Sequence, residues 1–154
     1  MEFLYFQRLK QPSPDEPSYT EIVKEHYANE AHWKDLTLQF DKIAQLGEER
    51  SVSTGFVLFP AVEAVREDYQ LQFVHEQVGQ YLEQIGVPYR DLTPALQGHT
   101  VNELVANSFD PHPNEKAHML VSGQVQELVE QLLQEKAITA TGSAQKKFEE
   151  FVKQ

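Results

Sequence analysis

The sequence predicts an α/β protein with a small parallel sheet, and three consecutive segments carry this prediction. The run from Val52 to Phe59 ends in four continuously apolar residues, which is typical of a strand buried on both faces. A long helix is predicted over about Glu67 to Ile85, where apolar residues recur at helical spacing until Gly86. A second, shorter strand is predicted from Val87 to Leu92. Because strand, helix and strand in this order form the unit of a parallel α/β sheet, the two strands are expected to pair in parallel.

Further helices are expected on both sides of this unit. The apolar spacing predicts one helix from Thr20 to Trp33 and another from Lys34 to Leu46. A short helical turn is expected over 93–98, whereas Val101 to Asn107 is compatible with either a helix or a strand. The last helix is predicted from Glu115 to Glu135.

The chain is expected to form one domain with an extension at each end. Residues 1–18 hold a short apolar segment and a proline-rich linker, which neither a helix nor a central strand accommodates. Residues 19–135 are predicted to form the α/β domain, and 136–154 a polar tail that can contain a short helix. A chain of 154 residues is long enough to bury a hydrophobic core.

Composition excludes several classes of function. Thirteen basic and 24 acidic residues give a net charge of -11, which repels nucleic-acid phosphates and anionic lipid. The absence of cysteine excludes disulfides, a thiol nucleophile and a cysteine zinc site. No apolar run approaches the roughly 18 residues of a membrane span, and the first residues do not resemble a secretion signal. We therefore expect a cytoplasmic protein without nucleic-acid or membrane partners, unless a longer parent carries a targeting signal.

The segment around His112 carries the clearest chemical signal. Asp110 precedes His112 by two positions, and Pro113 biases His112 toward an extended backbone. Asn114 is a favourable N-cap for the helix that begins at Glu115. A carboxylate beside an imidazole fixes the ring tautomer and stabilises the imidazolium, which a general base requires. The alternative is that His112 only caps the helix or lies in a polar turn, because short motifs often arise by chance.

The same segment resembles the last block of the SGNH (GDSL-like) hydrolases. Residues 112–118 match the pattern H-P-N-x-x-G/A-H at every defined position. The strand ending Leu58-Phe59-Pro60 and the segment Tyr89-x-Asp91-Leu92 occur in the order of that family, so the resemblance covers roughly 35 to 134. It implies a three-layer sandwich, as a partial SGNH or flavodoxin-like fold. It also implies ester hydrolysis with His112 as general base and Asp110 as its orienting acid.

Two departures from the family pattern shape the functional prediction. The family spacing D-x-x-H would place the acid at Phe109 rather than at Asp110. The Gly-Asp-Ser block, the oxyanion-hole glycine and the G-x-N-D block are absent, and these supply the nucleophile and the stabilisation of the tetrahedral intermediate. We therefore expect the C-terminal portion of an esterase-, lipase- or deacetylase-type hydrolase, inactive by itself. The alternative is a non-catalytic α/β remnant that serves as an interaction or oligomerisation module.

The remaining polar residues give weaker signals. Ser108 is close to His112 but lacks a strand-turn-helix elbow, and no other serine offers a better nucleophile. His26 and His32 are six residues apart, which is wrong for a metal site on one helix face. His118 is interpreted as a packing and hydrogen-bonding residue, and His75 and His99 as histidines without a partner motif. Asp91 is interpreted as a solvated turn carboxylate, with a place at the carboxyl edge of the sheet, where α/β sheets bind ligands, as the alternative. No cofactor and no metal are predicted.

The expected partners follow from the missing blocks. An ester substrate is expected only if a front half completes the site. A sheet of two strands that lacks its front half should expose a strand edge and apolar surface, which favours a homo-oligomer or a partner chain.

Overall fold

The computed structural model describes residues 17–62, 65 and 69–152 and has a mixed α/β fold. The predictions for residues 1–16 and for the start of the helix at Glu67 lie outside the described residues. The helices are α2 (Tyr19–Ala28), α3 (Glu30–Glu49), α4 (Gln72–Gln84), α5 (Thr93–Leu96), α6 (Val101–Leu104) and α7 (Glu115–Val152). The strands are β1 (Phe56–Leu58), β2 (Tyr89–Asp91), β3 (Val105–Asn107) and β4 (Asp110–Pro113).

The predicted parallel sheet is confirmed as a pair of short strands. β1 and β2 run parallel, with Phe56 opposite Tyr89 and Leu58 opposite Asp91. α4 joins them, so the strand-helix-strand unit read from the sequence is present. α4 ends at Gln84, and the predicted stop Gly86 follows its C-cap with a φ of 70° and the hydrogen bonds of a Schellman motif, from Gly86 N–H to Glu83 O and from Val87 N–H to Leu82 O. The three-layer sandwich stays a prediction.

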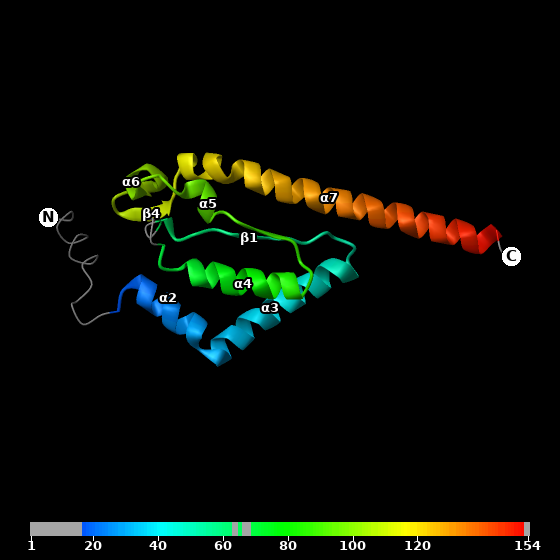
Figure 1. The fold of residues 1–154 in the computed structure, drawn as a ribbon, viewed down its shortest axis with the longest axis horizontal. Coiled ribbons are helices and arrows are strands. Elements are labelled where there is room, and N and C mark those ends of the chain that lie inside the picture. Colours follow the sequence, from blue (N-terminus) through cyan, green and yellow to red (C-terminus); the bar gives the residue numbers. More distant parts are fainter. Residues whose placement is uncertain (1–16, 63–64, 66–68, 153–154) are drawn as a thin grey trace.

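Helices cover both sides of the parallel pair, and two apolar clusters hold them there (Figure 1). The first cluster is centred on α4, and Phe40 of α3 and Phe56 of β1 pack against it. The second joins the end of β2 to α5, α6 and the start of α7 through Leu92, Leu96, Leu104, Ala117 and Val121. β1 runs toward the end of the molecule that carries α5, α6 and β4 (Figure 1). The carboxyl end of the sheet and the segment around His112 therefore share one end of the molecule.

Several predicted helix boundaries are wrong. α3 continues past the predicted end at Leu46 to Glu49, and α4 begins at Gln72, so the described residues 69–71 precede the helix instead of forming part of it. The N-terminal helices separate at Asn29 rather than after Trp33, because the Asn29 side chain accepts the backbone N–H groups of Ala31 and His32 and so caps α3. The last helix does not end at Glu135. α7 continues through the predicted tail to Val152, and its final turns extend beyond the rest of the fold (Figure 1).

The segment around His112, for which a polar turn was the alternative, forms a strand. Residues 110–113 form β4, which pairs antiparallel with β3. The ambiguous stretch from Val101 to Asn107 contains both alternatives, since α6 occupies its first four residues and β3 the last three. The motif therefore lies on a hairpin strand rather than on a free loop.

Two helical glycines give a matched test of the packing between α4 and β2. A Cβ added at Gly79 would lie 2.5 Å from the hydroxyl oxygen of Tyr89, whereas one added at Gly123 of α7 meets nothing within 4 Å. Gly79→Ala should therefore lower the free energy of unfolding by about 1–3 kcal/mol through overpacking. Gly123→Ala should raise it by about 0.5–1 kcal/mol through improved helix propensity. Urea unfolding monitored by circular dichroism measures both changes, and a stabilising Gly79→Ala would contradict the packing described.

Candidate functional site

His112 and Asp110 form a close pair on the exposed surface of β4. The imidazole Nδ1 lies 2.5 Å from Asp110 Oδ1, and the same oxygen accepts the His112 backbone N–H at 3.1 Å. The two side chains are 84% and 48% exposed, respectively. The predicted contact between them is therefore confirmed, while the catalytic role of either residue stays a prediction. One intervening residue between Asp110 and His112 is enough for this contact. The hydrogen bond from the His112 backbone N–H turns the Asp110 carboxylate back toward the ring.

The turn before β4 fixes the position of Asp110. Asn107 closes this turn, since its side-chain Oδ1 accepts the backbone N–H groups of Phe109 at 2.9 Å and of Asp110 at 3.1 Å. Asn107 and Asp110 also face each other in the β3–β4 register. Asn side chains commonly accept backbone N–H groups a few residues ahead in turns. Asp110 is consequently held at the start of its strand.

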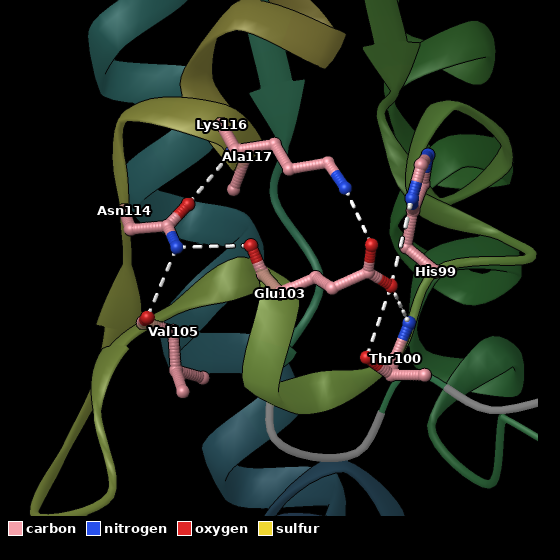
Figure 2. Close-up of polar contacts among 7 residues, drawn as sticks. All are labelled: His99, Thr100, Glu103, Val105, Asn114, Lys116 and Ala117. Carbon is pink, nitrogen blue, oxygen red and sulfur yellow. Dashed lines mark hydrogen bonds and ion pairs between the residues drawn. The ribbon is translucent and has the colours of Figure 1, made fainter.

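Asn114 connects the other end of β4 to three elements (Figure 2). Its Oδ1 accepts the N–H of Ala117 at 3.0 Å, which confirms the predicted cap of α7. Its Nδ2 donates to the backbone oxygens of Glu103, at the end of α6, and Val105, at the start of β3. Its backbone N–H donates to Leu104 O at 2.8 Å. The segment that follows His112 is thus clamped between α6, β3 and α7.

The Glu103 carboxylate reinforces this clamp (Figure 2). It accepts a bond of 2.6 Å from the Lys116 ammonium and bonds of 2.9 Å from the backbone N–H and hydroxyl of Thr100. The Lys116 bond, followed by those from Thr100, lowers the pKa of Glu103 to about 2. The carboxylate therefore stays ionised at neutral pH and ties α6 to the first turn of α7.

A second histidine–aspartate pair lies inside the fold. His75 of α4 is buried, and its Nδ1 is 2.8 Å from Oδ1 of Asp91 at the end of β2. Its Nε2 is 3.3 Å from the hydroxyl of Tyr69, which accepts the Ala61 backbone N–H. These contacts fit a neutral ring that donates from Nδ1 to Asp91 and accepts the Tyr69 proton at Nε2. The interpretation of Asp91 as a solvated turn carboxylate is wrong, and His75, which has no partner motif in the sequence, finds its partner in the fold.

The sequence contained one usable signal for this second pair. His75 lies among Leu71, Val74 and Val78, which recur at the spacing of the buried face of a helix. A polar residue on such a face requires a buried partner. The partner is 16 positions away, so it becomes identifiable only when α4 packs against the carboxyl end of β2.

The two pairs differ in what they can do chemically. Both ring nitrogens of His75 are engaged, so it cannot take a proton from a substrate without breaking the network. His112 uses Nδ1 for Asp110, and no described residue is hydrogen-bonded to its Nε2. An orienting acid on Nδ1 and an open Nε2 are what a general base requires. His112 is therefore the candidate reactive histidine, and His75 is a structural one.

The other histidines and serines do not add to the site. His118 packs as expected, with its ring 5.8 Å from that of Phe59. The rings of His26 and His32 lie 4.6 Å apart because the chain bends at Asn29, yet the described residues contain no group of three or more metal-ligating side chains. In the same described part, no serine hydroxyl is bonded to His112. No described helix is long and apolar enough to cross a bilayer.

Comparison with known proteins returns no matching family model, no matching curated protein and no matching solved structure. The resemblance to the SGNH hydrolases consequently rests on the residues of the motif and on their order along the chain.

The hydrogen bonds of Asp91 should make the free energy of unfolding depend on pH. Burial raises the pKa of Asp91, but bonds from His75 and from the Thr93 N–H and hydroxyl outweigh this and lower it to about 2. Between a pH of about 2 and the unfolded pKa near 3.9, the unfolded state binds more protons than the folded state. The contribution of Asp91 to the free energy of unfolding is therefore fully present at neutral pH and is lost as the pH falls toward 2. It amounts to about 2 kcal/mol.

Asp91→Asn keeps the acceptor oxygen and removes the charge. We expect the wild type to be more stable than this variant by about 2 kcal/mol at pH 7 and equal to it near pH 2. Urea unfolding of both proteins across this pH range measures the difference. A difference that does not change with pH would contradict the charged pairing of Asp91.

Proposed function

We propose that this chain carries the histidine–carboxylate pair of an SGNH-like ester hydrolase, with His112 as general base and Asp110 as its orienter. The observation that supports this most directly is the 2.5 Å contact at Nδ1 on a ring that is 84% exposed. His112 would take the proton of a serine hydroxyl through Nε2 and later deliver it to the leaving alcohol. The nucleophile and the oxyanion hole would come from another polypeptide segment.

The position of the pair supports this assignment. In open α/β sheets, ligands bind at the carboxyl ends of the strands. β1 runs toward the end of the molecule that holds the β3–β4 hairpin (Figure 1). The ring of Phe59, just after β1, lies 5.8 Å from that of His118 near the start of α7. The clamp at Asn114 would hold His112 at this edge during proton transfer, as a positioning group must.

The alternative role, a non-catalytic interaction module, predicts a different dependence on His112. In that role the Asp110–His112 contact only stabilises the hairpin. Removing the imidazole would then leave every chemical activity of a completed protein unchanged.

The assay combines this chain with a polypeptide that carries the Gly-Asp-Ser and G-x-N-D blocks. By itself the 154-residue chain should release p-nitrophenol from p-nitrophenyl acetate no faster than exposed histidines do. His112→Ala and the control His99→Ala should be alike in this state. The completed protein should turn over the ester, His112→Ala should abolish turnover, and Asp110→Asn should lower kcat by roughly 10³–10⁴.

Two results would contradict the proposal. Turnover by the completed protein that survives His112→Ala would remove His112 from the reaction. Turnover by the isolated chain that His112→Ala abolishes would require a nucleophile within this chain. A fluorophosphonate probe, which reacts with activated serines, distinguishes these cases because its attachment site identifies the nucleophile.

A further inference from the structure

The junction between α2 and α3 brings side chains of the two helices together. α2 ends at Ala28, and α3 begins at Glu30 with Asn29 as its N-cap. The two helices form a V whose open side faces α4 (Figure 1). On one continuous helix, only side chains three or four positions apart are neighbours. At this bend, pairs that are six positions apart meet instead.

Two of these pairs consist of aromatic rings. The ring centroids of His26 and His32 lie 4.6 Å apart, at an interplanar angle of 33°. Those of Tyr27 and Trp33 lie 6.3 Å apart, at an angle of 47°. Each pair takes one residue from α2 and one from α3. The bend at Asn29 therefore gathers four aromatic rings that neither helix could bring together by itself.

These four side chains surround a cavity of about 220 Å³. Leu36 of α3 is the fifth residue of its wall. His26 and His32 are exposed, whereas Tyr27, Trp33 and Leu36 are half-buried. A ligand would therefore enter beside the imidazoles and lie against the phenol, the indole and the leucine.

The two larger rings are held in place by contacts with the core. Tyr27 and Trp33 both pack against the apolar cluster centred on α4. The indole also meets the ring of Tyr81 in a T-shaped contact, with centroids 5.9 Å apart. Tyr81 in turn donates its hydroxyl proton to Asp41 of α3 at 2.7 Å. Because a wall that is already ordered reduces the entropic cost of binding, this cavity is suited to a small ligand.

The wall and its surroundings both favour a cation. The face of an aromatic ring is electronegative and attracts a cation within about 6 Å of the ring centroid. The two ring pairs are close enough for both members of each pair to lie within that distance of one ligand. Residues 21–36 include four acidic and two basic side chains, and the whole chain has a net charge of -11. The electrostatic potential around the cavity therefore attracts positive charge.

A metal ion suits this cavity less well than an organic cation. The two imidazoles are common metal ligands, but the described residues contain no group of three or more metal-ligating side chains. Zinc sites in proteins use three or four protein ligands. A quaternary ammonium group needs no ligating atom and no hydrogen-bond acceptor, and cages of aromatic rings recognise it.

We propose that the cavity binds a small quaternary ammonium compound of the choline type. Its methyl groups would lie against the aromatic rings and Leu36, while its charge would interact with the ring faces. Indole and phenol are the strongest of these faces, and Trp33 and Tyr27 supply them from the half-buried side of the cavity. The site shares no residue with the His112 pair, so it does not depend on the proposed ester hydrolysis.

The fluorescence of Trp33 tests this site specifically, because it is the only tryptophan of the chain. At pH 8, where imidazole is neutral, choline chloride should change the fluorescence of the full chain in a saturable way. The dissociation constant should be in the millimolar range or below. The control ligand is 3,3-dimethyl-1-butanol, which has the shape of choline with carbon in place of the charged nitrogen. It should bind about tenfold more weakly or worse, and sodium chloride should cause no saturable change.

Ring-deletion variants locate the binding site. Tyr27→Leu and His32→Ala each remove one ring of the wall and should weaken choline binding about threefold to tenfold. His32 is exposed, so the second variant retains the packing between α2 and α4. The matched control is Phe73→Leu on α4, which removes a ring that is 37% exposed and does not line the cavity. It should leave the affinity for choline unchanged.

Several results would overturn the proposal. Equal affinity for choline and for its uncharged analogue would show that the cavity selects apolar shape and not charge. The absence of a saturable response to choline would exclude the ligand class. An affinity that Phe73→Leu lowers as much as His32→Ala does would place the binding site elsewhere. Binding of phosphatidylcholine vesicles or of a trimethyllysine peptide without binding of choline would exclude a free small ligand.

Discussion

The candidate site depends on the side chain of Asn114. One amide joins the end of α6, the start of β3 and the first turn of α7 through three hydrogen bonds. The oxygen can only accept and the nitrogen can only donate, so the cap and the clamp use different atoms and form together. His112 precedes this anchor by two residues and Asp110 by four. The half-buried, fully hydrogen-bonded side chain of Asn114 therefore sets the geometry of the exposed pair.

The two histidine–aspartate pairs show how one residue combination serves different purposes. His75 and Asp91 join α4 to the carboxyl end of β2, and the bond continues to Tyr69 and the Ala61 backbone. This network stabilises the strand-helix-strand unit, because both ring nitrogens of the buried His75 are hydrogen-bonded to residues outside α4. At His112, Nδ1 bonds to Asp110, and none of the described residues is hydrogen-bonded to Nε2. The two pairs therefore differ in the exposure of the imidazole ring and in whether both of its nitrogens are hydrogen-bonded, not in residue type.

The sequence predicts features that local chemistry determines. The apolar run at 56–59 identified β1, Gly86 identified the end of α4, and the spacing from Asp110 to Asn114 identified both the acid–base contact and the helix cap. Features that depend on tertiary context were missed. The capping role of Asn29 was hidden by apolar spacing that continues across it. The β3–β4 hairpin was hidden because its strands are three and four residues long. The Thr- and Gly-containing segment 139–143 has low helix propensity, yet α7 continues through it.

A general base at this site requires that Asp110 hold the His112 ring with Nδ1 protonated and Nε2 available. Long-range ¹H–¹⁵N correlation spectra of the ring nitrogens test this most directly, because protonated and unprotonated nitrogens have distinct shifts. In the neutral form of His112 we expect a protonated Nδ1 and an unprotonated Nε2, and we expect Asp110→Ala to abolish this preference. A neutral His112 protonated at Nε2, or a preference unchanged by Asp110→Ala, would contradict it.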